Sequence, residues 1–271
     1  MTQWHENIIM ANGIHIHYYQ AGDLSKPTII LLHGLTDSGL CWTHVARALE
    51  QDYAVIMPDA RGHGSSDGVA SGFSNEILAD DVAGLIQALQ LEKPILLGHS
   101  MGGMTALTAA VRYPELLRAI LLEDPSIIDR SPQQAGSAAR STQMVKWLTD
   151  LKAMSRDELL ARVRRENPTW PQEEYGPWAD AKVAVDLAVC QSIGVIQRYW
   201  RDLNAHITCP VLLITGDVER GVRVTPETAH EVLRYWPAGE VVHIAGTGHN
   251  IRRDNYPDFM QAVQTFLHKV S

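Results

Sequence analysis

One short stretch constrains the fold of this chain more than any other. Residues 94–97 have the pattern of a buried strand, and a serine flanked by glycines follows them in the sequence G-H-S-M-G at residues 98–102. Helical spacing then continues to about Tyr113. Both glycines have a steric reason, because so tight a turn brings strand and helix together and a Cβ would clash. The pattern predicts a G-x-S-x-G turn that pushes the Ser100 hydroxyl out of the edge of a sheet.

Strands and helices alternate at short intervals around this turn. Continuous apolar runs are typical of strands buried on both faces of a parallel sheet. Such runs, or the alternation expected of a hairpin, occupy residues 7–20 (two strands), 28–32, 53–57, 117–122, 209–215 and 241–244. Helical spacing separates most of them. The order predicts an α/β fold with a mostly parallel, doubly wound sheet of eight strands and helices on both faces.

The alternation lapses between residues 126 and 205. Helical spacing covers residues 144–152, 156–165 and 181–201, and a break rich in proline and tryptophan, at residues 167–171 and 176–178, interrupts it. We therefore expect a core formed by residues 1–125 and 206–271, with residues 126–205 as a helical lid inserted after the sixth strand. Three lid tryptophans are candidates for the substrate pocket, although packing between lid and core is the commoner role of such residues: Trp147, Trp170 and Trp178.

Charge, cysteine content and apolar runs exclude several classes of partner. A formal net charge of −8 disfavours nucleic acid, which needs a basic surface. The three cysteines have neither paired nor metal-like spacing, so we expect no metal site and a reducing compartment. Neither a leader sequence nor an apolar run of about 18 residues is recognisable. These features predict a cytoplasmic protein without a membrane partner, and they leave open whether it is a monomer or a homodimer.

A serine hydroxyl is a poor nucleophile at neutral pH and needs a neighbouring base. Of the twelve histidines, His249 is the best placed, in a glycine-flanked loop directly after the last predicted strand. His33, Ser100 and Asp124 also follow predicted strands, and ligands of such sheets bind where the carboxyl ends of the strands meet. The sequence therefore predicts that Ser100 and His249 form a nucleophile and its base, with His33 as a further pocket candidate.

Four motifs together resemble the α/β-hydrolase superfamily. They are His33-Gly34, the D-A-R-G-H-G-S-S loop at residues 59–66, the turn at 98–103, and G-T-G-H at 246–249. Together with the order of the strands, they extend the resemblance over nearly the whole chain outside the lid. The chain is similar to the lid-bearing bacterial esterases, enol-lactonases, carbon–carbon bond hydrolases and cofactor-free haloperoxidases of that group. The resemblance implies that no cofactor is needed. It also implies an oxyanion hole formed by the backbone N–H groups of Leu35 and Met101.

The acid that orients His249 is left open by the sequence. The family usually places an aspartate three residues after the glycine that ends the seventh strand, and that offset from Gly216 reaches Glu219. Asp217 is the only aspartate in this loop. Some relatives place the acid after the sixth strand, where Asp124 stands. We favour Asp124 slightly and rank Asp217 and Glu219 almost equally after it. Only geometry decides which carboxylate reaches the imidazole.

The leading functional hypothesis is a serine hydrolase. It would cleave a carboxylic ester or lactone of a largely apolar small molecule through an acyl-enzyme. Carbon–carbon bond hydrolysis, acyl transfer and perhydrolysis would use the same residues and remain alternatives. A ligand receptor that kept the fold and lost turnover is a third class. Because the serine, the histidine and the oxyanion loop are all intact, that third class is disfavoured.

Overall fold

A computed structural model of the chain describes residues 4–70, 72–127, 137–192 and 207–270. Eight strands form one sheet in the order β1-β2-β4-β3-β5-β6-β7-β8. The pairs β1–β2 and β2–β4 are antiparallel, and all other neighbouring pairs are parallel. The expected mostly parallel sheet of eight strands is confirmed. The strands are β1 (His5–Ala11), β2 (Ile14–Ala21), β3 (Thr28–Leu32), β4 (Ala54–Pro58), β5 (Ile95–His99), β6 (Ala119–Glu123), β7 (Val211–Thr215) and β8 (Gly239–His243).

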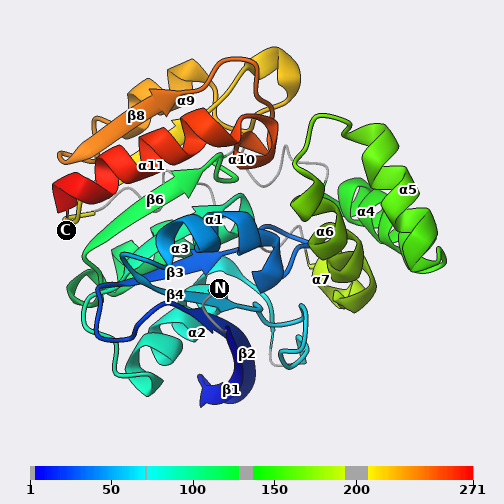
Figure 1. Cartoon of the computed structure of the whole chain (residues 1–271), viewed down its shortest axis with the longest axis horizontal. Coiled ribbons are helices and arrows are strands. Elements are labelled where there is room, and N and C mark those ends of the chain that lie inside the picture. The colour runs from blue at the N-terminus through cyan, green and yellow to red at the C-terminus, as the bar shows by residue number, and fades with distance from the viewer. Residues whose placement is uncertain (1–3, 71, 128–136, 193–206, 271) are drawn as a thin grey trace.

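Helices cover both faces of the sheet (Figure 1). One face packs against α1 (Thr43–Leu49), α10 (Ile251–Asp254) and α11 (Tyr256–Val270). The other packs against α2 (Asn75–Ala88), α3 (Met101–Arg112) and α9 (Pro226–Val232). Short 3-10 turns occupy Gly39–Trp42, Pro114–Leu116 and Val218–Arg220. No helix in the described part of the chain is long and apolar enough to cross a membrane.

The continuous apolar runs form strands because both faces of the sheet need apolar side chains. In β3, Ile29 and Leu31 join the apolar cluster under α1 and α11, whereas Ile30 and Leu32 join the one under α2 and α3. Successive side chains of a strand point to opposite faces, so a strand covered on both sides has no position for an exposed polar residue. This packing fixes the register of the central strands and places their carboxyl ends along one edge.

A helical insertion follows β6 and stands beside the core (Figure 1). Its described helices are α4 (Ser137–Lys152), α5 (Arg156–Glu166), α6 (Gln172–Ala184) and α7 (Leu187–Gln191). One apolar cluster lies within the insertion and includes Leu159, Trp170 and Trp178. Another joins it to the core, where Leu148 and Val189 share a cluster with Met101. The expected insertion after the sixth strand is therefore present.

The helices of the insertion differ in detail from those expected. Residues 176–178, expected to lie in a break, belong to α6, with Pro177 inside the helix. A proline there removes one backbone hydrogen bond, and packing of the neighbouring Trp178 and Tyr175 in the insertion's own cluster compensates for it. Residues 193–201 of the third expected helix, and the expected upper limit of the lid at 205, lie outside the described residues.

Candidate active site

Ser100 occupies the sharp turn between β5 and α3. Its φ of +52° is unusual for a residue with a side chain, and such a conformation persists only when its surroundings impose it. A Cβ at Gly98 would lie 2.2 Å from the carbonyl oxygen of Gly102, and one at Gly102 would lie 2.1 Å from that of Leu32. Both glycines are therefore required by the close approach of strand and helix. The turn leaves the Ser100 side chain at the carboxyl edge of the sheet.

The imidazole of His249 contacts this serine. His249 Nε2 lies 3.0 Å from Ser100 Oγ, within hydrogen-bonding distance. The loop that carries His249 is joined to the turn that carries Ser100, because His99 Nε2 donates to the His249 carbonyl at 2.9 Å. Burial holds the pKa of His99 well below its usual value, so this ring is neutral and donates through one nitrogen. Ser126 Oγ is also 3.3 Å from Ser100 Oγ.

On its other side, His249 contacts Asp124. His249 Nδ1 lies 2.5 Å from Asp124 Oδ2, and Asp124 is fully buried directly after β6. The same carboxylate accepts the backbone N–H groups of Arg223 and Val224 at 2.9 to 3.0 Å. A buried carboxylate with this many donors is held in one orientation. Ser100, His249 and Asp124 thus form one continuous line of contacts.

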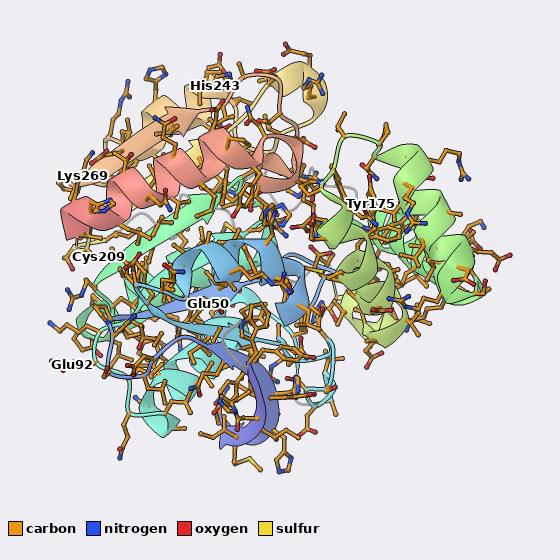
Figure 2. All side chains as sticks on the ribbon, viewed as in Figure 1. Glu50, Glu92, Tyr175, Cys209, His243 and Lys269 are labelled. Atoms are coloured by element: carbon orange, nitrogen blue, oxygen red, sulfur yellow. The ribbon has the colours of Figure 1, made fainter. Side chains whose placement is uncertain are left out.

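The other two candidate acids lie elsewhere. Asp217 Oδ1 accepts from His243 Nε2 at 3.0 Å, and its second oxygen accepts from Gly246 N–H at 2.7 Å. Figure 2 shows His243 at the outer margin of the core, away from the insertion. Glu219 lies in an exposed turn and has no described contact with His249. Of the three carboxylates that the sequence leaves open, Asp124 is the one in contact with the imidazole.

A tight turn after β3 carries the first expected oxyanion donor. Asp37 N–H donates to the Gly34 carbonyl at 3.1 Å and closes a four-residue turn. Thr36 has a φ of +68°, as a type II turn requires at its third position, where glycine is usual. Leu35, in this turn, and Met101, at the first position of α3, both line the pocket beside Ser100. Both residues expected to supply the donors therefore line the pocket that also contains Ser100.

Two buried histidines hold this turn. His33 Nδ1–H donates to the Gly34 carbonyl at 2.8 Å, and its Nε2 accepts from Ala60 N–H at 3.0 Å. His63 Nε2 accepts from Thr36 N–H at 3.4 Å. Burial lowers the pKa of His33 and lowers that of His63 to about 3, so both rings are neutral at physiological pH. These histidines position backbone and have no nitrogen left for a substrate.

A pocket of about 410 Å³ opens beside Ser100 between the core and the insertion. Trp147, Trp170 and Trp178 all line it, with Met101, Met104 and Met144. His33 does not line it; His33 lines a separate, smaller cavity. The volume lies in the range of small-molecule sites. In the described residues no group of histidine, cysteine or carboxylate side chains could hold a metal ion.

Sequence reasoning missed a cluster of buried charges on the pocket wall. Asp37, Glu174, Lys182 and Arg253 are each at most 4% exposed and join α6 of the insertion to the core. One local signal was present: Arg252 and Arg253 stand at the start of the short helix after His249, where the helix dipole disfavours cations. Two arginines in such a place indicate nearby carboxylates, but their identity needs the fold.

Comparison with known proteins identifies a family and several relatives that this chain resembles. The model of the family described as alpha/beta hydrolase fold matches residues 27–255. The chain is 27% identical over 255 residues to a 2-(acetamidomethylene)succinate hydrolase of Mesorhizobium japonicum, covering 90% of this chain and 88% of that one. It is 26% identical over 272 residues to an N-formylmaleamate deformylase of Pseudomonas putida, covering 96% and 95%. An enol-lactonase structure from Burkholderia xenovorans superposes with a TM-score of 0.79 at 23% identity, covering 97% of this chain and 100% of that one.

Proposed function

Because the chain belongs to the α/β-hydrolase fold family, we propose that it is a serine hydrolase that cleaves a carboxylic ester or lactone of a small, largely apolar molecule. One observation carries the proposal: the unbroken line of contacts from Asp124 through His249 to Ser100 Oγ. A nucleophile, a base in contact with it and a buried acid behind the base are the three parts that acyl transfer to serine requires.

Acylation begins when Ser100 Oγ attacks the carbonyl carbon and its proton moves to His249 Nε2. The carbonyl oxygen takes up the negative charge and faces the N–H groups of Leu35 and Met101. Collapse of this intermediate breaks the bond to the leaving oxygen, which receives the proton from His249. The products of this half-reaction are the alcohol and an ester between the acyl group and Ser100.

Deacylation repeats these steps with water as the nucleophile. His249 removes a proton from water, the hydroxide attacks the acyl carbon, and the proton returns to Ser100 Oγ as the carboxylic acid leaves. Asp124 accepts the Nδ1–H of His249 throughout, which keeps Nε2 free to act as the base and stabilises the imidazolium. The tryptophan and methionine side chains of the pocket suit an apolar acyl or alcohol group.

The test is whether Ser100 reacts as an activated nucleophile. We expect the wild type to hydrolyse a short p-nitrophenyl ester and to be labelled by a fluorophosphonate at the peptide that contains Ser100, with the ester slowing the labelling. Peptide mass spectrometry identifies the labelled residue. An added alcohol or thiol acceptor shows by product analysis whether acyl transfer competes with hydrolysis. A protein that is neither labelled nor active on esters and lactones would falsify the hydrolase proposal.

A second candidate function is hydrolysis of an amide or ester that carries a carboxylate. The two relatives compared above are named for substrates of this kind. In this chain, Arg223 lines the pocket with an exposed side chain, and its guanidinium has no partner among the described residues. Lys182 and Arg253 on the same wall are paired with carboxylates. Among the described residues, the wall therefore has one uncompensated positive charge, which favours an anionic group on the substrate.

Replacing Arg223 with glutamine tests this preference. With mono-p-nitrophenyl succinate we expect kcat/KM to fall about 5- to 20-fold, since one charge-assisted hydrogen bond is lost. With p-nitrophenyl butyrate, whose acyl chain has the same length without the carboxylate, the value should stay within about threefold. Arg220→Gln, in the same loop but outside the pocket lining, is the matched control. Equal losses on both esters in Arg223→Gln would contradict carboxylate recognition.

A further inference from the structure

Six buried charges connect the insertion with the catalytic loops. They are the cations Lys182, Arg252 and Arg253 and the carboxylates Asp37, Glu123 and Glu174, each at most 4% exposed. Asp37 is the centre, because Lys182 lies 3.0 Å from one of its oxygens and Arg253 lies 3.1 Å from the other. Burial alone would raise the pKa of Asp37, but the cations around it hold that pKa well below its usual value. Asp37 is therefore ionised, and the cluster has three cationic and three carboxyl side chains.

Each hydrogen-bonding direction of Lys182 is already occupied. Its Nζ donates to the Thr36 carbonyl at 2.7 Å and to Asp37 Oδ1 at 3.0 Å. The remaining side of the ammonium faces the ring of Trp178, with Nζ 4.9 Å from the ring centroid. An ammonium has three protons, so these contacts account for all of them. Although Lys182 borders the pocket, it has no donor left for a substrate.

In the turn at residues 34–37, Lys182 binds the Thr36 carbonyl and Asp37, whereas the two histidines bind the Gly34 carbonyl and the Thr36 N–H. Asp37 N–H donates to the Gly34 carbonyl, and that carbonyl shares a planar trans peptide with Leu35 N–H. The two groups of one peptide point in opposite directions, so fixing the Gly34 carbonyl aims Leu35 N–H. The direction of the Leu35 N–H therefore depends on the position of Asp37 and on the positive φ of Thr36. Lys182 holds both residues at once.

We propose that Lys182 is a positioning residue, by which the insertion holds the turn at residues 34–37 so that Leu35 N–H faces the developing oxyanion. The inference rests on the proposed hydrolase function. Lys182 is not the only ion-pair partner of Asp37, because Arg253 at 3.1 Å and Arg252 at 3.6 Å also face it. Among the described residues, only Lys182 donates a side-chain hydrogen bond to the Thr36 carbonyl.

Lys182→Met removes this hydrogen bond while keeping a side chain of similar length. We expect kcat for p-nitrophenyl butyrate to fall about 10- to 100-fold, since a small displacement of one oxyanion donor has a cost of this order. A trifluoromethyl ketone forms a hemiketal with serine and presents an oxyanion, so its Ki should rise by about the same factor. KM should stay within about threefold. Rates are expressed per active site, counted by fluorophosphonate labelling.

Lys152→Met is the matched control. Lys152 is also a lid lysine that donates to a backbone carbonyl, but its acceptor, Val183, lies within the insertion. We expect wild-type kcat and Ki in this variant. Hydrogen–deuterium exchange gives a readout independent of turnover: residues 34–37 should exchange faster in Lys182→Met and at the wild-type rate in Lys152→Met.

A double variant, Lys182→Met with Asp37→Asn, separates positioning from charge balance. It removes one cation and one carboxylate, so the buried cluster stays neutral and folding is protected even where the single variant fails to fold. We expect it to retain the loss in kcat and the rise in Ki, because the Thr36 carbonyl still lacks its donor. A return to wild-type kcat would overturn the positioning role, as would a Lys182→Met variant that changes only KM. A wild type without labelling or ester hydrolysis overturns the hydrolase function itself and this role with it.

Discussion

Replacing Ser100 with alanine is expected to lower kcat for p-nitrophenyl butyrate by about 10⁶-fold, because no other group can form the acyl-enzyme. The residual rate would come from the oxyanion donors and the pocket, which the substitution leaves in place. Initial rates at high enzyme concentration, with the liberated p-nitrophenol quantified, measure a loss of this size. Circular dichroism confirms that the variant is folded.

The neighbouring hydroxyl of Ser126 provides a strict control. Its Oγ lies 3.3 Å from Ser100 Oγ but has no hydrogen bond to His249 among the described contacts. Ser126→Ala should lower kcat by no more than about tenfold, the effect of one neutral hydrogen bond. If the two alanine variants lose activity equally, the pocket rather than the Ser100 nucleophile explains the loss, and the acyl-enzyme mechanism is wrong.

Asp124→Asn is expected to lower kcat by about 10⁴-fold. An asparagine can still accept the backbone N–H groups of Arg223 and Val224, so the loop geometry is kept. It also presents an amide donor to His249 Nδ1, which stabilises the tautomer whose Nε2 carries the proton and cannot act as a base. KM should change little, and the measurement is kcat with thermal unfolding as the control for folding.

The two other candidate acids supply matched variants for this experiment. Asp217→Asn and Glu219→Gln should keep kcat within about threefold, as expected of substitutions away from the imidazole. Asp217 bonds to His243 and Gly246 instead. A collapse of kcat in Asp217→Asn together with near wild-type activity in Asp124→Asn would assign the acid to the loop after β7.

The parts of the site that follow from local chemistry were predictable from the sequence. The turn that carries Ser100 is specified by a few neighbouring residues, because the close contacts of such a turn require glycine at positions 98 and 102. His249 could be placed from its glycine-flanked loop at the end of the last strand. The strands β3 to β7 could be recognised because burial on both faces requires continuous apolar runs, whereas β1 and β2 follow from the alternation of a hairpin.

The acid could not be chosen in the same way. Asp124 and Asp217 follow the neighbouring strands β6 and β7, so both lie at the carboxyl edge of the sheet. What separates them is orientation: Asp124 has a φ of +37° and accepts two backbone N–H groups from the loop after β7. Those contacts join residues about a hundred positions apart. The periodic patterns of helices and strands do not indicate contacts at that separation.

The buried charges were missed for a related reason. Lys182 and Asp37 are separated by 145 residues, and Arg253 and Asp37 by 216. In sequence Lys182 and Asp37 resemble ordinary surface charges. The helix through Pro177 was also missed, because proline usually ends a helix and only the surrounding lid packing offsets its cost. Both errors concern tertiary contacts that override a local preference.

The ion pairs between α6 and the core restrict the exchange of the insertion between related proteins, in evolution and in the laboratory. A recombination that exchanged the insertion for one from another family member would remove Lys182 and Glu174 together. Asp37 and Arg253 would then remain buried with fewer partners, a destabilising situation for both charges. We therefore expect the insertion to be exchangeable only together with the segments after β3 and His249. Lid grafting in this chain requires these four positions to be transferred as a set.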